Sequence, residues 1–302
     1  DFEKVGLPMY PDQSLKENII HGTPQNPIHA MHFTAPLPER FFVERHWHHY
    51  VEIVFITKGS YLFEINLESH LLSEGDICFL NSEDLHQFTG NELSAVHDVV
   101  LFDPRILGFS YGDEWELSYA APFLNRSLIF QNILRPRDEG YPEISRLLSR
   151  LLARALSPSD GWYLSCKLLL LEIFGFMASH RMLLSVKEVM SPDNARKILR
   201  YKTIVSYIEE HYQEPVSLQQ LADAIPCNSQ YLCRFFREIA GISPIQYLIS
   251  YRLEKACSLL SHTALPITEI AMDCGFDNIS YFIRKFKECR GCTPGAYRGR
   301  RI

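Results

Sequence analysis

Histidine, tyrosine and glutamate side chains are spaced in the N-terminal half in a way that could support ligand chemistry. His46, His48, Tyr50 and Glu52 alternate along the chain, so in a strand they would point to one face. If that face lines the interior of a barrel, His46, His48, Glu52 and the later His86 converge. Three imidazoles and a carboxylate can coordinate a divalent metal, or they can hydrogen-bond one another and a small polar ligand.

A polar ligand pocket is the interpretation that we favour over a metal site. A mixture of imidazole, carboxylate and aromatic groups suits a sugar or a similar polar metabolite, so we expect no resident cofactor and keep a divalent metal as the alternative. His97 is a further candidate because it shares a strand face with Val99 and Leu101, although it could equally be a core residue. The candidate ligand-binding residues are therefore His46, His48, Tyr50, Glu52, His86 and His97.

The elements that must position these residues are short β-rich runs between His29 and Asp103. Runs of this kind occupy 51–57, 61–67, 77–80 and 95–102, with turn residues between them. About eight such runs over this length predict a small antiparallel barrel or sandwich. Residues 140–182 then change to helical spacing around a break at 157–161, which predicts a helical hairpin. Its two helices are expected to carry one apolar stripe each, formed by Ile144, Leu147, Leu148, Leu151 and Leu152 in the first and by Leu164, Leu168, Leu171 and Phe174 in the second.

The expected fold class is a multi-domain α+β chain with an N-terminal antiparallel β-barrel, a helical hairpin and an all-α C-terminal domain. A chain of 302 residues with 46% hydrophobic positions is long enough for two domains. The predicted boundaries are 1–136 for the barrel with an N-terminal arm, 137–183 for the hairpin, 184–194 for a linker and 195–302 for the last domain.

Charge divides the chain in the same place. The net charge is −6 overall, whereas residues 195–302 hold 15 Lys and Arg against 10 Asp and Glu, a balance of +5. The acidic remainder carries −11. A basic domain favours a polyanionic partner because neutralising phosphates releases counterions, but a balance of +5 needs a motif to support it.

That motif is an internal repeat with an offset of 49 and then 50 residues, which implies a single-residue insertion in the second copy. Each copy is predicted to be two short helices joined by a tight turn, a geometry that presents the second helix to a DNA major groove. A connecting helix is expected over about 245–261. The matched pairs are Leu218/Ile267, Leu221/Ile270, Ala222/Ala271, Tyr231/Tyr281, Arg234/Arg284, Phe236/Phe286, Arg237/Lys287, Gly241/Gly291, Pro244/Pro294 and Tyr247/Tyr297.

Helical spacing divides each second helix into a buried and an exposed face. The positions predicted to be buried are Tyr231, Leu232, Phe235 and Phe236 in the first copy, and Tyr281, Phe282 and Phe286 in the second. Arginine can hold guanine with two hydrogen bonds, whereas residues later on the helix are expected at phosphates. The plainer alternative is that these are only exposed residues of a helical bundle. The candidate DNA-binding residues are Ser229, Gln230, Cys233, Arg234, Arg237, Ile279, Ser280, Ile283, Arg284 and Lys287.

The run from Gly275 to Lys287, followed by Gly291, Pro294 and Tyr297, resembles the signature of AraC/XylS-type transcription regulators. The resemblance covers about 204–298 and implies two helix-turn-helix units that read successive major grooves of double-stranded DNA. The resemblance also implies homodimerisation through the hairpin, an N-terminal arm over the barrel mouth, and RNA polymerase as a further partner.

The run from His46 to Glu52 with Gly59 resembles the first cupin motif, and Gly75, Asp76 and His86 resemble the second. Asn81 and Glu83 stand where the second motif has Pro and Gly. Such a barrel is the effector-binding domain in many AraC-type regulators, so the two resemblances together imply a regulator controlled by a small-molecule effector and not an enzyme. A metal-dependent cupin enzyme joined to a DNA-binding module is the alternative.

Eight cysteines without a disulfide-framework spacing fit a reducing compartment. Cys289 and Cys292 form one CxxC pair, which leaves a redox or metal sensor as a further alternative. The most apolar stretch, 164–178, is interrupted by Lys167 and Glu172. We therefore expect a cytoplasmic protein with no membrane partner.

Overall fold

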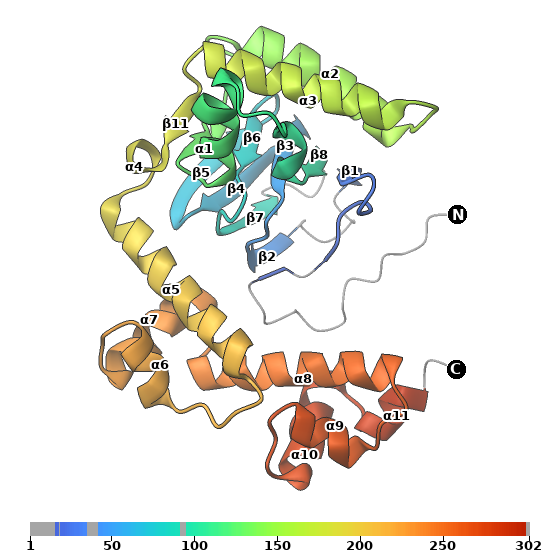
Figure 1. Ribbon diagram of the computed structural model, residues 1–302, viewed down its shortest axis with the longest axis vertical. Helices are drawn as coiled ribbons and strands as arrows, with labels where there is room; N and C mark the ends of the chain where they lie inside the picture. Colours follow the sequence, from blue (N-terminus) through green and yellow to red (C-terminus); the bar gives the residue numbers. More distant parts are fainter. Residues whose placement is uncertain (1–15, 18, 35–41, 91–94, 300–302) are drawn as a thin grey trace. The chain divides into compact units, whose positions relative to one another are not determined.

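The computed structural model describes residues 16–17, 19–34, 42–90 and 95–299 (Figure 1). Within them the chain forms two compact units, Lys16–Ala195 and the residues from Arg196 onward. The predicted N-terminal arm falls partly on residues 1–15, which lie outside the described part of the chain. Each unit is considered by itself below.

The N-terminal unit is built from two antiparallel sheets that face each other. One sheet has the strand order β1-β8-β3-β6-β10, the other has the order β2-β7-β4-β5, and a small pair joins β11 to β9. The predicted antiparallel barrel is thereby confirmed. The strands are β1 Ile28–Thr34, β2 Phe42–His46, β3 Val51–Lys58, β4 Ser60–Ile65, β5 Glu68–Ser73, β6 Ile77–Leu80, β7 His86–Gly90, β8 Val96–Phe102, β9 Leu128–Phe130, β10 Ile133–Leu134 and β11 Leu183–Ser185.

The two sheets differ in burial because, among the described residues, helices pack on the outer face of the five-stranded sheet and not on that of the four-stranded one. In β3 the side chains of Val54 and Ile56 enter the space between the sheets, while Val51 and Ile53 pack under helices. The strand therefore reads as a nearly continuous apolar run. β4 instead alternates buried and more exposed positions, such as buried Phe63 beside Leu62, which is 47% exposed.

The predicted hairpin consists of α2 Tyr141–Leu156 and α3 Trp162–Ser179. It packs on the outer face of the five-stranded sheet (Figure 1). The predicted stripe on the first helix is buried as expected, but the stripe on the second is wrong in its first half, because Leu164 and Leu168 are 61% and 57% exposed. Four short helices complete the unit: η1 Pro104–Leu107, η2 Glu116–Ala120, α1 Ala121–Leu124 and α4 Val186–Val189.

By length and composition alone, α3 is the one helix in the described ranges that could cross a membrane. Six of its side chains nevertheless belong to the core that the hairpin shares with the sheet, among them Leu170, Phe174 and Met177. The core helix of a soluble protein passes the same test of length and hydropathy, so this helix is weak evidence for a membrane span.

The C-terminal unit is helical and contains the two predicted helix-turn-helix units. Ser217 and Asn228 cap the helices of the first unit, and Asn278 caps the second helix of the second unit, as the side-chain oxygens of Ser and Asn do at helix N-termini. The helices are α5 Pro192–His211, which begins in the preceding unit, α6 Leu218–Ala224, α7 Ser229–Ala240, α8 Pro244–His262, α9 Ile267–Asp273, α10 Ile279–Arg290 and α11 Pro294–Gly299.

Helix α8 joins the two helix-turn-helix units by contributing to both cores. Near its start, Tyr247 contacts Phe236 of α7 with ring centroids 5.6 Å apart. Further along, Leu253 and Leu260 pack in a cluster with Phe282 and Phe286 of α10. One helix therefore fixes the spacing between α7 and α10, which is what a double reader of DNA requires.

Candidate functional site

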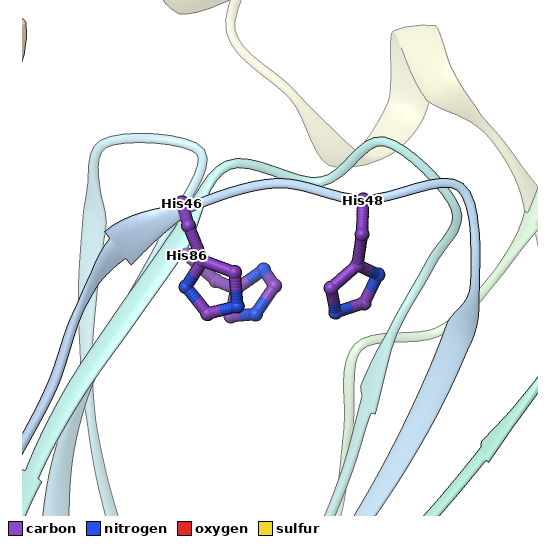
Figure 2. Close-up of side chains that lie close together, drawn as sticks. All are labelled: His46, His48 and His86. Carbon is purple, nitrogen blue, oxygen red and sulfur yellow. The ribbon is translucent and has the colours of Figure 1, made fainter. Parts of the chain in front are cut away.

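Three of the predicted histidines converge at one end of the space between the sheets. His46 ends β2 and pairs with His86 at the start of β7, while His48 lies in the loop that leads to β3. Each histidine offers one ring nitrogen as a ligand atom, and these three nitrogens all lie within 4.8 Å of one another. Figure 2 shows all three rings pointing to the same side of the backbone.

Each of the three imidazoles is oriented by a backbone carbonyl. The Nδ1 atoms of His46, His48 and His86 lie 2.8, 3.1 and 2.9 Å from the carbonyl oxygens of residues 44, 50 and 84. A carbonyl oxygen only accepts, so each Nδ1 carries the proton and donates it. A neutral ring then has its lone pair on Nε2, whereas His48 in its protonated form donates from Nε2 to Glu52.

Glu52 of β3 completes the predicted cluster. Its Oε2 atom lies 3.3 Å from Nε2 of His48 and 3.7 Å from Nε2 of His86, and the side chain is 6% exposed. Burial disfavours the charged form of His48, but the hydrogen bond and the charge of Glu52 outweigh it and raise the pKa of His48. For His46, burial and the charge of His48 lower the pKa.

The loop that carries His48 is held in place by the loop before His86. The backbone N–H of Glu83 donates to the carbonyl of His48 at 2.7 Å. Glu83 has a φ of +65° at the position where the cupin motif has glycine. The buried carboxylate of Asp84 stabilises this turn by accepting from Arg126 at 3.0 Å and from the backbone N–H of Asn81 at 2.9 Å.

The other two predicted ligand-binding residues are buried in the same unit. Tyr50 is 4% exposed, and its hydroxyl accepts from the backbone N–H of His21 at 3.1 Å. His97 is fully buried, stacks on Phe33 and lies 2.8 Å from the hydroxyl of Tyr61. Burial lowers the pKa of His97 to about 4.

Two residues near the cluster escaped the sequence analysis. Glu17 lies beside the histidines because its backbone N–H donates to the carbonyl of Trp47 at 2.8 Å, and its carboxylate contacts Nε2 of His21 at 3.1 Å. Burial works against the charge of Glu17, but the bond to His21 and the charges of His46 and His48 outweigh it and lower its pKa. The segment before β1 has no periodicity that could have indicated this position.

The two second helices of the C-terminal unit present matching exposed faces. Arg234 of α7 and Arg284 of α10 are both exposed, and each guanidinium lies over the tyrosine three residues earlier, at 6.0 and 5.3 Å from the ring centroid. The two tyrosines, Tyr231 and Tyr281, are only partly buried, so the prediction that they are buried is corrected. An exposed guanidinium above them explains the difference.

The remaining candidate DNA-binding residues lie on or beside these faces. Gln230, Arg237, Ser280, Ile283 and Lys287 are exposed. The partly buried ones are Ser229, Cys233 and Ile279, of which Ser229 contacts Gln219 of α6 at 3.4 Å. Phe236, Phe282 and Phe286 are fully buried, as predicted.

The CxxC pair lies at the end of α10. Both cysteines are reduced, with Cys292 buried and Cys289 partly buried. Both cysteines belong to the C-terminal unit, whereas the histidine cluster belongs to the N-terminal unit.

Comparisons with known proteins agree with both halves of this description. Residues 30–174 match the family described as an AraC-like ligand binding domain, and residues 221–300 match the family described as a helix-turn-helix domain. The uncharacterized HTH-type transcriptional regulator YdeC of Bacillus subtilis (strain 168) is 26% identical over 288 residues, which cover 95% of this chain and 97% of YdeC.

Two further similarities cover most of the chain or its C-terminal unit. The HTH-type transcriptional activator RhaS of Enterobacter sp. (strain 638) is 24% identical over 258 residues, which cover 85% of this chain and 88% of RhaS. The solved C-terminal domain of the two-component response regulator yesN from Fusobacterium nucleatum subsp. nucleatum ATCC 25586 is 39% identical. The match covers 32% of this chain and 95% of the solved domain, with a TM-score of 0.31.

Proposed function

Because the chain belongs to the AraC-type transcription regulators, we propose that a small polar effector in its barrel controls how it binds a specific DNA sequence. The relatives are transcription regulators, and the prediction that the chain is not an enzyme is confirmed. The observation that carries the proposal is the pair Arg234 and Arg284, exposed at corresponding positions of α7 and α10 and supported by the same stacking contact.

The proposed division of labour on DNA follows the position of each side chain along its helix. Arg234 and Arg284 lie in the first half of α7 and α10 and are assigned to base edges, where arginine can bind guanine through two hydrogen bonds. Arg237 and Lys287 lie later on the same helices and are assigned to phosphates, which position the protein without reading sequence.

The proposed effector site is the buried cluster of His46, His48, Glu52 and His86, together with Tyr50 and His97. Imidazole, carboxylate and hydroxyl groups in an otherwise apolar barrel suit a small polar molecule such as a sugar. The effector changes DNA binding only if it binds the two states of the protein with different affinity, and the linkage is reciprocal.

The proposed assembly is a cytoplasmic homodimer formed through the hairpin at 137–183. Leu164 and Leu168 support it, because two large apolar side chains one helical turn apart lie exposed on α3. A dimer would place four helix-turn-helix units on repeated half-sites. Contact with RNA polymerase is the expected route from DNA binding to transcription.

The DNA assignment is tested with Arg284→Ala in the full chain. We expect the variant to lose about 1–3 kcal/mol of preference for its target over random DNA, measured by gel-shift titration on a duplex that the wild-type chain selects from a random library. Arg150→Ala, which removes an exposed arginine of α2 in the other unit, is the matched control and should bind as the wild type does. An unchanged preference in Arg284→Ala would refute the assignment.

The effector assignment is tested with His48→Ala in a reporter assay. We expect this variant to keep its binding to the selected duplex and to lose the response to the effector that a thermal-shift screen identifies. An intact effector response would show that the effector does not bind at this cluster.

A further inference from the structure

Within the C-terminal unit, helix α5 packs along the first helix-turn-helix unit. The ring of Tyr201 contacts that of Phe236 of α7, with centroids 4.9 Å apart. One turn earlier on the same helix, the guanidinium of Arg200 donates to the hydroxyl of Tyr231 at 3.3 Å. The position of α5 is therefore tied to that of α7.

The chain just beyond the end of α5 contacts the second helix-turn-helix unit instead. Arg252 of α8 donates from Nε to the carbonyl of Tyr212 at 2.6 Å and from a terminal nitrogen to the carbonyl of Glu214 at 2.7 Å. The side chain of Gln213 donates to the carbonyl of Asp273, the last residue of α9, at 2.8 Å. These five residues, called the clasp below, connect the two helix-turn-helix units in addition to α8.

The turn between α9 and α10 is shaped to admit the clasp. A Cβ at Gly275 would lie 2.4 Å from the carbonyl oxygen of Tyr212 and 2.9 Å from Nε of Arg252, so the backbone can approach this closely only at a glycine. The guanidinium carbon lies 5.8 Å from the ring centroid of Phe276. Burial lowers the pKa of Arg252, and the charge of Asp277 opposes this effect.

The planar fork of Arg252 gives the clasp its direction. A guanidinium holds its N–H donors in a fixed plane and can bond two carbonyl oxygens at once, whereas the ammonium of lysine is a compact point charge. The last carbonyl groups of an α-helix have no partner within the helix. Those of Tyr212 and Asp273, at the ends of α5 and α9, obtain one here. The clasp thereby fixes where the chain leaving α5 lies against α8 and α9.

A double reader of DNA needs this kind of support, because successive turns of a major groove lie about 34–36 Å apart. Long helices bend, so α8 alone would let the two units change their spacing. We propose that Arg252 and Gln213 are positioning residues, which hold α7 and α10 at the spacing at which both helices bind one DNA duplex. The proposal rests on the proposed function in one respect, namely that α7 and α10 read DNA.

The test starts from the duplex that the full wild-type chain selects from a random library. Each base pair is substituted in turn, and the affinities of Arg234→Ala and Arg284→Ala are compared with that of the wild type. The positions to which a variant has become insensitive define the sub-site of its helix. If neither variant has such positions, the proposed function is refuted and the clasp proposal with it. Every later failure refutes the clasp proposal alone.

One base pair is then inserted between the two sub-sites, which turns one of them by about 34–36° relative to the other. We expect the wild type to bind this longer duplex at least about tenfold more weakly than the selected one, since one helix loses its base contacts. In Arg252→Lys the ratio of the two affinities should fall to about threefold or less, because units with a looser spacing discriminate less between the duplexes. The salt dependence should be unchanged, because lysine keeps the charge.

Gln213→Ala is the second variant. It removes an exposed side chain with one bond across the clasp, so it should fold and should also lower the ratio. It decides the test if Arg252→Lys does not fold. Circular dichroism, together with wild-type affinity for a duplex that keeps only the α10 sub-site, establishes that each variant is folded.

The matched control is Arg298→Lys. The guanidinium of Arg298 donates to the carbonyl of Leu265 at 2.6 Å, a bond of the same kind that does not involve the chain after α5. This variant should keep the wild-type ratio. A wild-type ratio in both clasp variants, or an equal fall in Arg298→Lys and Arg252→Lys, would overturn the proposal. So would equal losses by Arg252→Lys on all duplexes with a smaller salt slope, the mark of a phosphate contact.

Discussion

Gly275 and Gly241 provide a matched pair of substitutions in the C-terminal unit. Both glycines follow a helix and have left-handed φ values, +80° for Gly275 and +72° for Gly241. An L-residue in this conformation costs about 1–2 kcal/mol. Backbone conformation alone therefore predicts similar losses of stability for Gly275→Ala and Gly241→Ala.

The surroundings of the two glycines are different. A Cβ at Gly241 would meet nothing within 4 Å, whereas a Cβ at Gly275 would lie 2.4 Å from the carbonyl oxygen of Tyr212 and 2.9 Å from Nε of Arg252. These two atoms hydrogen-bond each other at 2.6 Å. The methyl group must displace at least one of them, and a bond to a charged group contributes about 1.5–3 kcal/mol. We expect Gly275→Ala to cost about 3–5 kcal/mol and Gly241→Ala about 1–2 kcal/mol.

Chemical unfolding of the full chain checks this difference. Far-UV circular dichroism follows the helices, whereas tryptophan fluorescence follows only the N-terminal unit, because Trp47, Trp115 and Trp162 all precede Arg196. In Gly275→Ala, part of the helical signal should be lost at a lower denaturant concentration than in the wild type. The fluorescence transition should stay at the wild-type concentration. Equal destabilisation by the two alanine variants would refute the argument from the Tyr212 contact.

Three further predictions concern charge, pH and assembly. Lys287→Ala should weaken binding to all DNA sequences alike and reduce the slope of log affinity against log salt by about 1, and a slope equal to that of the wild type would remove the phosphate assignment. His97 has a folded-state pKa of about 4 against an ordinary value of 6.5, so the unfolded chain binds the proton more readily, and about 3 kcal/mol of stability present at neutral pH should be lost as pH falls from 6.5 to 4. Urea unfolding of His97→Gln should lack this acid-dependent loss, and a pH dependence identical to that of the wild type would contradict it. Leu168→Glu should shift the sedimentation coefficient of the chain towards that of a monomer, whereas an unchanged dimer would place the interface elsewhere.

The convergence of the histidines was predicted correctly from an incorrect local structure. Alternation along a single strand places His46, His48 and Glu52 on one face, but in the structure His46 ends β2, His48 lies in a loop and Glu52 belongs to β3. His46 and His86 meet because β2 pairs with β7, and the loop of His48 is held beside them because the N–H of Glu83 bonds to the carbonyl of His48. That contact joins segments 35 positions apart and has no signature in the spacing of the histidines.

The helical faces were predictable because their periodicity is local. Phe236 and Phe286 are buried as the 3.6-residue repeat requires. The repeat overstates the burial of Tyr231 and Tyr281, although an arginine three residues later in each copy was a readable signal, since positions i and i+3 on a helix are neighbours. The prediction that Leu164 is buried is wrong for a different reason. Helix α3 is apolar on more than one face, so periodicity alone does not identify the face that packs.

The single-residue insertion between the two copies can now be located. In the first unit the N–H of Cys227 bonds to the carbonyl of Ala222, and in the second the N–H of Phe276 bonds to the carbonyl of Ala271. Each bond closes the end of the first helix over the same number of residues. The capping residue follows Cys227 directly, whereas Asp277 intervenes after Phe276. The extra residue is therefore Asp277, in the turn and not in either helix.

The same alignment pairs Gly275 with Pro226, and this pairing shows why the two turns are not interchangeable. The N–H of Gly275 bonds to the carbonyl of Met272 while its φ is left-handed, the arrangement of a Schellman motif. Proline has no N–H and a fixed negative φ, so Pro226 can supply neither feature. The helices of the two units thus follow one pattern of buried residues, while their turns are built from different chemistry. Gly275 can approach Tyr212, which follows α5, so closely because the turn of the second unit has a glycine at this position and therefore no Cβ.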